Sequence, residues 1–362
     1  MRFAILCLLV YNLSYSQESF LPDAIDANFL TGNILPHSPD LYHLIKGHPK
    51  GFLLNFTNRT SGEKSWHKLY NYPDYGYYFL HQDFENHILG KNYSAGFFYN
   101  FYFLRRHLSV KLAQGATLNT NPHNNETNNK NTAFGSSYLL NANVGLSYKR
   151  ENIFENIGVQ AGLIFTHYSN GRIKSPNSGI NTYNINVGLN YNLSETTQKN
   201  DSVPILSLKF TEPIRYNFVF RSGVNESPTI GSGQKLFYHF GFYADKRINR
   251  KSALHLGTEV FLTTSRKEYI RFRAIAYPEK PVDINTDYRR ASLFIGHELF
   301  INKVSIETQI GYYIYDPFKF DIPIYNRIGA KYYFCDKIFT GVALKTHGFL
   351  AEAIEFSVGC RL

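Results

Sequence analysis

A histidine and a serine two residues apart carry the most specific chemistry in this sequence. They are His167 and Ser169, in the stretch THYSNGRIKSPNSGIN that covers residues 166–181. A serine hydroxyl becomes a nucleophile when an imidazole takes its proton and a third polar group orients that imidazole. The sequence has no aspartate or glutamate from residue 156 to residue 194. The third group is therefore either a carboxylate from elsewhere in the chain or a neutral side chain such as Asn181.

The residues before the pair predict that it lies on a β-strand. Odd positions from Ile157 to Phe165 are apolar, whereas the even positions are mostly glycine or polar residues. A period of two places alternate side chains on the same face of a strand. His167 and Ser169 continue the apolar odd series, so they project from the same face. If residues 171–179 form a symmetric hairpin loop, Ser169 lies opposite Asn181 and His167 lies diagonal to it.

The same alternation recurs along the chain and predicts an all-β, transmembrane antiparallel β-barrel. The long runs suit tilted membrane strands, and the polar faces, rich in Asn, Ser and Gly, suit a wet lumen. Candidate strands, with boundaries uncertain by roughly 2 to 4 residues, are 49–57, 93–104, 107–118, 136–149, 156–170, 180–194, 203–222, 234–247, 252–274, 287–301, 302–316, 322–334, 337–347 and 350–362. We expect about 12 to 14 strands in one barrel domain over residues 17–362. Residues 18–48 should be irregular, and residues 58–92 should form a loop or a further hairpin. A large soluble β-sandwich or barrel is the alternative.

The N-terminus predicts export. Arg2 precedes the apolar run 3–10, and Ser14 and Ser16 follow it, which is the layout of a signal peptide over residues 1–16. That run is too short to span a bilayer, and no later stretch reaches the roughly 18 uncharged apolar residues that a membrane helix needs. The formal net charge of +10 suits an anionic lipopolysaccharide surface. Nothing resembles a nucleic-acid-binding module, and we expect a protein embedded in the bacterial outer membrane.

Loop lengths predict where the histidine and serine lie relative to the membrane. The polar segment 119–133 is the longest polar loop between clear strands, and long loops of outer-membrane barrels are extracellular. The strand over 136–149 would then descend to a periplasmic turn at 150–155, and the strand over 156–170 would ascend. His167 and Ser169 are therefore expected near the outer surface, facing lipid, where acyl esters of the outer leaflet are within reach.

The motif resembles a known family of outer-membrane enzymes. HYSN followed by PNSGIN is similar to the signature of lipid A 3-O-deacylases, the PagL family, also described as acyloxyacyl hydrolases. The match covers residues 166–181, with compatible strand patterning on both sides. The resemblance implies a serine esterase that removes an ester-linked acyl chain from lipid A without a metal or an organic cofactor.

The resemblance also implies roles for individual residues. His167 corresponds to the general base and Ser169 to the nucleophile. The side chain of Asn177 and backbone N–H groups near Asn170 and Gly171 would bind the oxyanion. Arg172 and Lys174, in the same turn, could pair with lipid A phosphates, although basic residues in such a turn are often only solvated.

Two departures from the family pattern leave alternatives open. The family has a glutamate directly after Gly-Ile, where this chain has Asn181, and a neutral amide can orient an imidazole but does not stabilise its charged form. Familiar members are also small, eight-stranded barrels. The alternatives are a noncatalytic outer-membrane barrel, porin-like or structural, and a deacylase that acts on phospholipid. The sequence does not define the oligomeric state.

Two cysteines follow the signal peptide, Cys335 and Cys360. If residues 337–347 and 350–362 form a hairpin, the two come near one another at the periplasmic end, where disulfides are permitted. A disulfide is one possibility, and two free thiols are the other.

Overall fold

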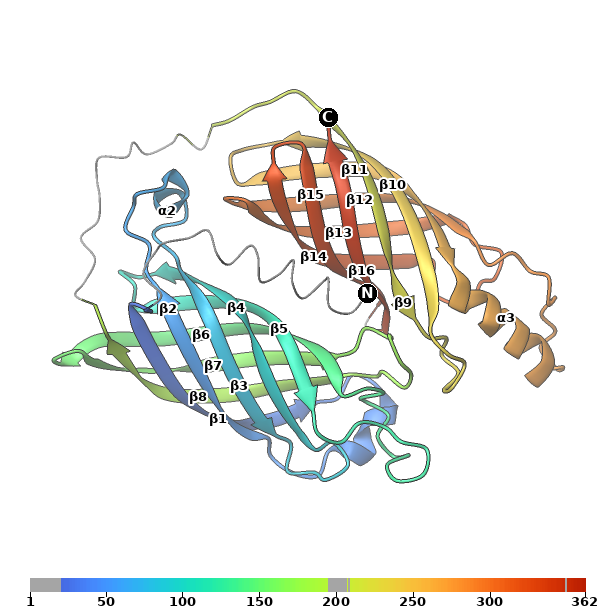
Figure 1. Ribbon diagram of the computed structural model, residues 1–362, viewed down its shortest axis with the longest axis horizontal. Helices are drawn as coiled ribbons and strands as arrows, with labels where there is room; N and C mark the ends of the chain where they lie inside the picture. Colours follow the sequence, from blue (N-terminus) through green and yellow to red (C-terminus); the bar gives the residue numbers. More distant parts are fainter. Residues whose placement is uncertain (1–20, 195–206, 208, 349) are drawn as a thin grey trace.

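Two antiparallel β-barrels of eight strands each make up the fold (Figure 1). The computed structural model describes residues 21–194, 207, 209–348 and 350–362. The strands of the first barrel are β1 (Ala24–Leu35), β2 (Lys50–Asn58), β3 (Asp74–Asp83), β4 (Lys91–Phe103), β5 (Leu108–Asn119), β6 (Tyr138–Phe154), β7 (Ile157–Ser169) and β8 (Ile180–Asn192). Those of the second are β9 (Arg215–Asn225), β10 (Lys235–Arg247), β11 (Ser252–Thr263), β12 (Arg290–Ile301), β13 (Val304–Tyr315), β14 (Ile324–Cys335), β15 (Ile338–His347) and β16 (Leu350–Arg361).

The prediction of an all-β antiparallel barrel is confirmed, but the structure corrects the number of barrels and strands. The described residues form sixteen strands in two barrels, where one barrel of about 12 to 14 strands was expected. Each barrel closes because its last strand pairs with its first, β8 with β1 and β16 with β9. Alternation along the sequence reports on which faces strands present, and it does not report on these long-range pairings.

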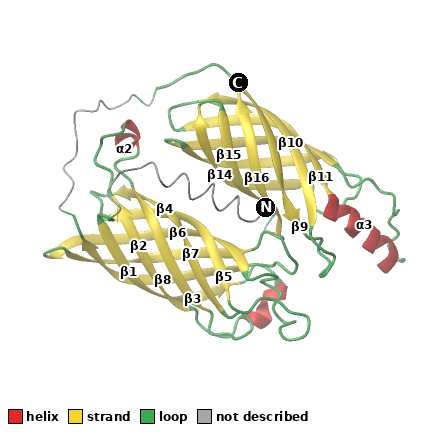
Figure 2. Ribbon diagram, in the orientation of Figure 1, coloured by secondary structure: helices red, strands yellow, loops and turns green. Residues whose placement is uncertain are grey.

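Three segments differ from their predicted local structure. Residues 18–48, expected to be irregular, contain β1 and the 3-10 helix η1 (Pro39–Leu44). Residues 58–92 contain the short helix α2 (Ser65–Leu69) and the strand β3. The strand expected over 252–274 ends at Thr263, where helix α3 (Thr264–Ala276) begins. All three helices lie outside the barrel walls, in connections between strands (Figure 2). The predicted signal peptide, residues 1–16, lies outside the described residues.

The strands present apolar side chains outward and polar side chains inward. On β7, Leu163 is 58% exposed and Phe165 is 38% exposed. The even-numbered Gln160 and Thr166 of the same strand are buried. The outward faces of β8, β11 and β12 follow the same rule with Ile185, Leu256 and Ile295. Such apolar walls with polar interiors are typical of membrane barrels. Among the described helices, none is long and apolar enough to cross a membrane.

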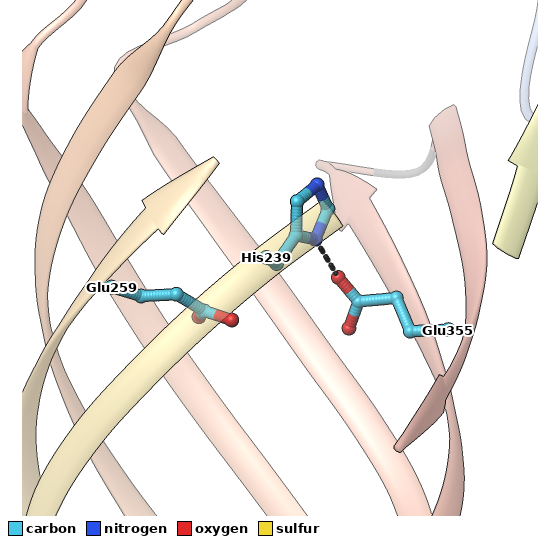
Figure 3. A group of neighbouring side chains, drawn as sticks. All are labelled: His239, Glu259 and Glu355. Atoms are coloured by element: carbon cyan, nitrogen blue, oxygen red, sulfur yellow. Dashed lines mark hydrogen bonds and ion pairs between the residues drawn. The ribbon is translucent and has the colours of Figure 1, made fainter. Parts of the chain in front are cut away.

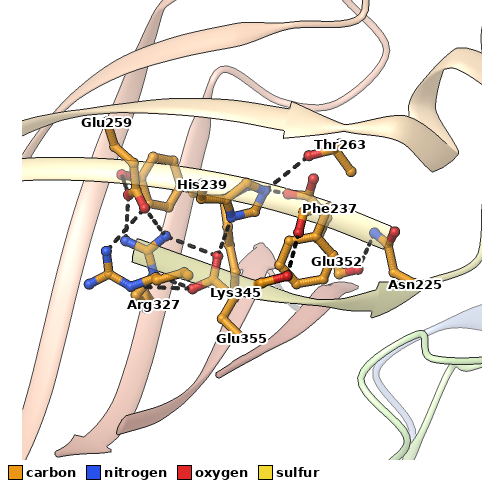
Figure 4. A network of polar contacts seen from close by, with 12 residues as sticks. Asn225, Phe237, His239, Glu259, Thr263, Arg327, Lys345, Glu352 and Glu355 are labelled. Atoms are coloured by element: carbon orange, nitrogen blue, oxygen red, sulfur yellow. Dashed lines mark hydrogen bonds and ion pairs between the residues drawn. The ribbon is translucent and has the colours of Figure 1, made fainter. Parts of the chain in front are cut away.

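Side chains fill the interiors of both barrels, as expected because eight strands enclose room for side chains only. The first lumen is mostly neutral: the phenol of Tyr168 donates to Gln82 at 2.8 Å, and Gln160 donates to Asn28 at 2.6 Å. The second lumen holds a network of buried ion pairs, with Arg327 bonded to Glu259 and Glu355 (Figure 4).

The two barrels have their long connections at the same end. In the first barrel residues 36–49, 84–90, 120–137 and 170–179 connect strands at that end, and in the second residues 226–234, 264–289 and 316–323 do so. Most connections at the opposite end are short, with the exception of residues 59–73. The barrels touch at both ends: the Tyr70 hydroxyl donates to the Phe300 carbonyl at 2.5 Å, and residues 171–175 contact residues 226–234. Both barrels can therefore sit in one membrane with the same orientation.

Candidate active site

The hairpin of β7 and β8 positions the predicted histidine and asparagine directly opposite one another. His167 pairs with Asn181 in the strand register, and its Nδ1 lies 2.6 Å from Asn181 Oδ1. The expected register, with Ser169 opposite Asn181, is wrong because the loop over 170–179 is not symmetric and β8 starts at Ile180, paired with Tyr168. The observed register brings the imidazole straight onto the amide.

Ser169 is the last residue of β7 and is only 5% exposed, while His167 is half-buried. Both belong to the outward-facing series, but the loop over 170–179 returns across them. At Gly179, a Cβ atom would lie 3.2 Å from His167 Cε1 and 3.3 Å from Ser169 Cβ. Gly179 also has a φ of +69°, a conformation that other residues rarely adopt. The site therefore depends on a glycine that lets the chain pass close to both catalytic candidates and shield them from water.

The connection between β5 and β6, residues 120–137, supports this loop. The backbone N–H groups of Ser178 and Gly179 donate to the carbonyls of Thr132 and Ala133, both at 3.1 Å. Gly135 packs so closely that a Cβ atom there would lie 2.4 Å from the Lys174 carbonyl oxygen. The long polar loop seen in the sequence thus acts as a scaffold for the site.

The residues predicted to bind the oxyanion lie together, but the hydrogen bonding of Asn170 differs from the prediction. The Asn170 N–H, proposed as an oxyanion donor, instead donates to Asn177 Oδ1 at 2.8 Å. That bond orients the Asn177 amide and leaves its Nδ2 group buried with no partner among the described residues. The Gly171 N–H donates to Ser169 Oγ at 3.3 Å. Of these groups, Asn177 Nδ2 is thus the donor without a partner among the described residues, and the Gly171 N–H lies beside the serine oxygen.

No hydrogen bond joins His167 Nε2 to Ser169 Oγ in the described part of the chain. Catalytic hydrogen bonds are often long or poorly aligned before substrate binds, and they shorten in the substrate complex. A Cβ atom at Gly179 would lie against both side chains, so His167 and Ser169 flank the same glycine.

A second histidine, which the sequence did not point to, extends the site. His37, between β1 and η1, has its Nδ1 3.1 Å from Asn181 Nδ2 and its Nε2 2.8 Å from the Ser178 carbonyl oxygen. The polar chain therefore runs from His167 through Asn181 to His37. His37 precedes Asn181 by 144 residues, and no local spacing signals their contact. It is reached only through the pairing of β1 with β8, in which Leu35 lies opposite Asn181.

The two basic residues of the loop have different surroundings. Lys174 is exposed, so it stays available to an anionic group. Arg172 lines a cavity together with Glu226, Asp321 and Glu352 of the second barrel. Burial lowers the pKa of Arg172, and the carboxylates of Asp321 and Glu352 oppose that effect. Carboxylates of its own chain thus line the same cavity as Arg172, and its pairing with a lipid A phosphate stays a prediction.

The second barrel holds the other side of the active-site loop. Glu226 is buried, and its Oε2 accepts from the Ser175 N–H at 2.7 Å while its own N–H donates to the Arg172 carbonyl at 2.9 Å. The Ser175 hydroxyl donates to the Ser227 carbonyl at 2.7 Å, and Gln234 Nε2 donates to the Ile173 carbonyl at 3.0 Å. We call these contacts the barrel junction; they fix the first half of the loop.

The residues that could bind a metal lie away from this site. His239, Glu259 and Glu355 gather in the lumen of the second barrel (Figure 3). Arg327 donates to Glu259 Oε2 at 2.7 Å and to Glu355 Oε2 at 2.5 Å, so its guanidinium already neutralises the carboxylates. A cation would have to displace that arginine. This cluster is therefore part of the ion-pair network of the lumen.

The two cysteines do not form the disulfide considered from the sequence; both are free. Cys335 on β14 and Cys360 on β16 each pair with Ile338 on β15, from opposite sides. Two strand spacings of about 4.8 Å separate them, which exceeds the reach of a disulfide.

Comparison with known proteins divides the chain in the way the barrels do. Residues 50–190 match the family described as lipid A 3-O-deacylase (PagL), and residues 214–362 match the C-terminal domain of acyloxyacyl hydrolase. The first region covers β2 to most of β8, and the second covers β9–β16. None of the curated proteins compared with the chain matches it.

Solved structures with similarity to the chain include porins. A triple mutant of the Rhodopseudomonas blastica porin is 8% identical, covering 93% of this chain and 99% of that chain, with a TM-score of 0.21. A structure described as "Asymmetric conductivity of engineered proteins" is 9% identical, covering 94% and 98%, with a TM-score of 0.20. Scores this low carry no argument. The two family matches, in contrast, together span most of the chain, and the chain therefore belongs to the lipid A 3-O-deacylase (PagL) and acyloxyacyl hydrolase family.

Proposed function

We propose that this protein is a serine esterase of the bacterial outer membrane that removes an ester-linked acyl chain from lipid A. The observation that carries the proposal is the 2.6 Å contact between His167 Nδ1 and Asn181 Oδ1, beside Ser169 on an outward-facing strand. A hydroxyl, an imidazole and an orienting group in this order are the parts of a nucleophilic acyl-transfer site. Membership of a lipid A deacylase family supports the choice of substrate.

The first half of the reaction forms an acyl-enzyme. Ser169 Oγ attacks the ester carbonyl of the lipid while His167 Nε2 takes its proton, and Asn181 holds the imidazole through Nδ1. The tetrahedral oxyanion receives hydrogen bonds from Asn177 Nδ2 and the Gly171 N–H. Loss of one such donor costs roughly 3 to 4 kcal/mol of transition-state stabilisation in a serine protease.

The second half restores the enzyme. The intermediate collapses, and His167 passes its proton to the leaving sugar hydroxyl, so the sugar departs and the acyl chain stays on Ser169. Water, activated by the same imidazole, then attacks the acyl-enzyme and releases the fatty acid. The protein groups in these steps are three side chains, those of Ser169, His167 and Asn177, the Asn181 amide that orients the imidazole, and one backbone N–H, that of Gly171.

The surroundings of the hairpin support a lipid substrate. Leu163, Phe165 and Tyr183 form an exposed apolar wall on β7 and β8 below the site, on which an acyl chain can lie. Lys174 stands in the loop above it, exposed and suited to an anionic headgroup. The site is at the end with the long connections, which is the extracellular end of such barrels. An ester in the outer leaflet would thus meet Ser169 from the side.

A phospholipid ester offers the same bond to the same serine, so substrate choice needs a direct test. Lipid A from cells that express the protein should lose one ester-linked acyl chain in mass spectra. Ser169→Ala, at equal outer-membrane abundance, should leave lipid A intact. Ser178→Ala is the matched control, because Ser178 contributes its backbone carbonyl and N–H to the site. Lipid A unchanged by the wild type, with shortened phospholipids instead, would move the proposal to phospholipid.

A further inference from the structure

We propose that His37 is a positioning residue that lets an asparagine replace an acid in this site, by setting which end of the Asn181 amide faces His167. The inference rests on the proposed esterase function and deepens it. It is carried by the three contacts that join His167, Asn181, His37 and the Ser178 carbonyl.

An amide has a difficulty here that a carboxylate does not have. Both oxygens of a carboxylate accept hydrogen bonds, so either rotation orients an imidazole in the same way. An amide has one accepting end and one donating end. If Asn181 turned its NH2 group toward His167, Nδ1 would have to accept, the ring proton would sit on Nε2, and the imidazole would have no lone pair for Ser169. The wrong rotation therefore inactivates the base, as a wrong tautomer does in serine proteases.

The polar chain excludes that rotation one step at a time. The Ser178 carbonyl can only accept, so the His37 ring nitrogen 2.8 Å away, Nε2, carries a proton. In a neutral His37 the other nitrogen, Nδ1, must then accept, and it takes a hydrogen bond from Asn181 Nδ2 at 3.1 Å. The oxygen of Asn181 is left for His167, whose Nδ1 donates to it at 2.6 Å. His167 Nε2 is thereby unprotonated and ready to act as a base.

Backbone structure holds each member of this series of hydrogen bonds in place. Asn181 lies opposite Leu35 in the pairing of β8 with β1, so His37 follows two residues after that pair. The carbonyl that starts the chain belongs to Ser178, whose N–H is itself bonded to Thr132. The rotation of Asn181 is therefore set by His37, from the connection between β1 and η1, together with Ser178, from the loop of the β7–β8 hairpin itself.

The test compares the effect of His37 in two backgrounds. His37→Leu removes the acceptor for the Asn181 amide, and we expect kcat on a long-chain p-nitrophenyl ester to fall about tenfold or more, within the roughly 10⁴-fold that a wrong tautomer costs a serine protease. With Asn181→Glu, a carboxylate accepts from His167 in either rotation. In that background His37→Leu should lower kcat about twofold or less, because the Asn181 amide on which His37 acts is absent. An equal loss in both backgrounds would overturn the proposal and assign His37 to folding alone.

His43→Leu is the matched control, because His43 lies in the same connection and its ring bonds to the Lys130 carbonyl, at 2.7 Å, and not to Asn181 or His167. It should leave kcat unchanged in both backgrounds. Heat-modifiable mobility of each variant reports whether its barrel is folded.

A second readout does not depend on esterase activity. In the ¹⁵N spectrum of histidine-labelled protein, the His167 signal, assigned as the one that disappears in His167→Gln, should report a proton on Nδ1. In His37→Leu it should shift toward the Nε2-protonated form. A shift without any esterase activity would keep the His37 inference and reject the proposed function. An unshifted His167 signal would reject the inference even in an active enzyme.

Discussion

The two barrels share strand number, order and orientation, yet the candidate active site lies on the first. The difference lies in the hairpin of the seventh and eighth strands. In the first barrel a long loop, residues 170–179, joins β7 to β8 and returns over Ser169. In the second barrel β15 ends at His347 and β16 begins at Leu350, so no chain is available to build an oxyanion site. The chemistry therefore depends on the loop that the barrel supports, and not on the barrel itself.

The histidines at these two hairpins illustrate the same contrast. His167 is part of the outward series and bonds to a neutral amide. His347 is buried, and its Nε2 accepts from the Tyr313 hydroxyl at 2.9 Å inside the second lumen. One histidine lies on the outward face of its barrel, and the other lies inside its barrel.

The largest effect is expected from the histidines. His167→Ala removes the base, and activity should fall by roughly 10⁴-fold or more while the protein folds normally. His239→Ala, in the second lumen, removes a 2.7 Å bond to Glu355. It should lower stability by about 1 to 3 kcal/mol and leave kcat nearly unchanged. Esterase assays beside urea unfolding in detergent separate the two results. A large kcat loss in His239→Ala would contradict the assignment of catalysis to the first barrel alone.

The ion pairs of the second lumen should give the next largest effect. Arg327→Met removes one of the two buried arginines that Glu259 and Glu355 share, Arg221 being the other, which should cost about 3 to 5 kcal/mol of stability. Hydrogen exchange in peptides of β14 reports on the second barrel. Emission from Trp66, the one tryptophan of the chain, reports on the first, where it contacts Tyr75 and Tyr99. Faster exchange in β14 with an unchanged Trp66 transition is the expected pattern; equal loss in both would show that the barrels unfold as one unit.

Substitutions in the mostly neutral lumen of the first barrel should lower the free energy of unfolding less. Gln82 accepts from Tyr168 and Thr182 and donates to Asn184, so Gln82→Leu removes three hydrogen bonds between neutral groups. The expected loss is about 1 to 3 kcal/mol, below that of Arg327→Met, because no charge is stranded. Urea unfolding followed by Trp66 emission measures it. A loss larger than that of Arg327→Met would reverse the comparison of the two lumens.

The smallest effect concerns the barrel junction, through which the second barrel acts on the first. Glu226→Ala removes the acceptor of the Ser175 N–H, so the loop should loosen and kcat should fall roughly three- to tenfold. Glu268→Ala, on α3, is the charge-matched control. The Glu268 side chain is 42% exposed, and its ion pair with Lys235 is long, at 3.8 Å. Unchanged kcat in Glu226→Ala would mean that the second barrel does not help to position the loop.

Features of the fold that depend on neighbouring residues can be predicted from the sequence, and features that depend on distant residues cannot. The candidate strand over 180–194 corresponds closely to β8, because its alternation of Asn or Gly with apolar residues is strict. β1 escapes notice because its inward Asp26 and Asn28 are followed by outward residues as small as Ala27 and as polar as Thr31. Closure into two barrels depends on β8 finding β1 and β16 finding β9, and no local pattern encodes those pairs.

The same reasoning applies to the site. His167, Ser169, Asn177 and Asn181 lie in one short motif, so their types and spacing point to their grouping. The roles of Asn170, whose N–H is used internally, and of Arg172, which faces the second barrel, depend on loop geometry that spacing does not define. His37 comes from another hairpin altogether, and only strand pairing brings it to Asn181.

The claim that the chemistry lies on the first barrel is tested most directly by covalent labelling of the nucleophile. A fluorophosphonate with a long alkyl chain, applied to the purified protein, should modify Ser169, as read from the mass of the tryptic peptide that contains it. The label should disappear in Ser169→Ala, and it should be strongly reduced in His167→Ala and unaffected in His239→Ala. Labelling of a different residue, or of Ser169 equally well without His167, would contradict the proposed mechanism.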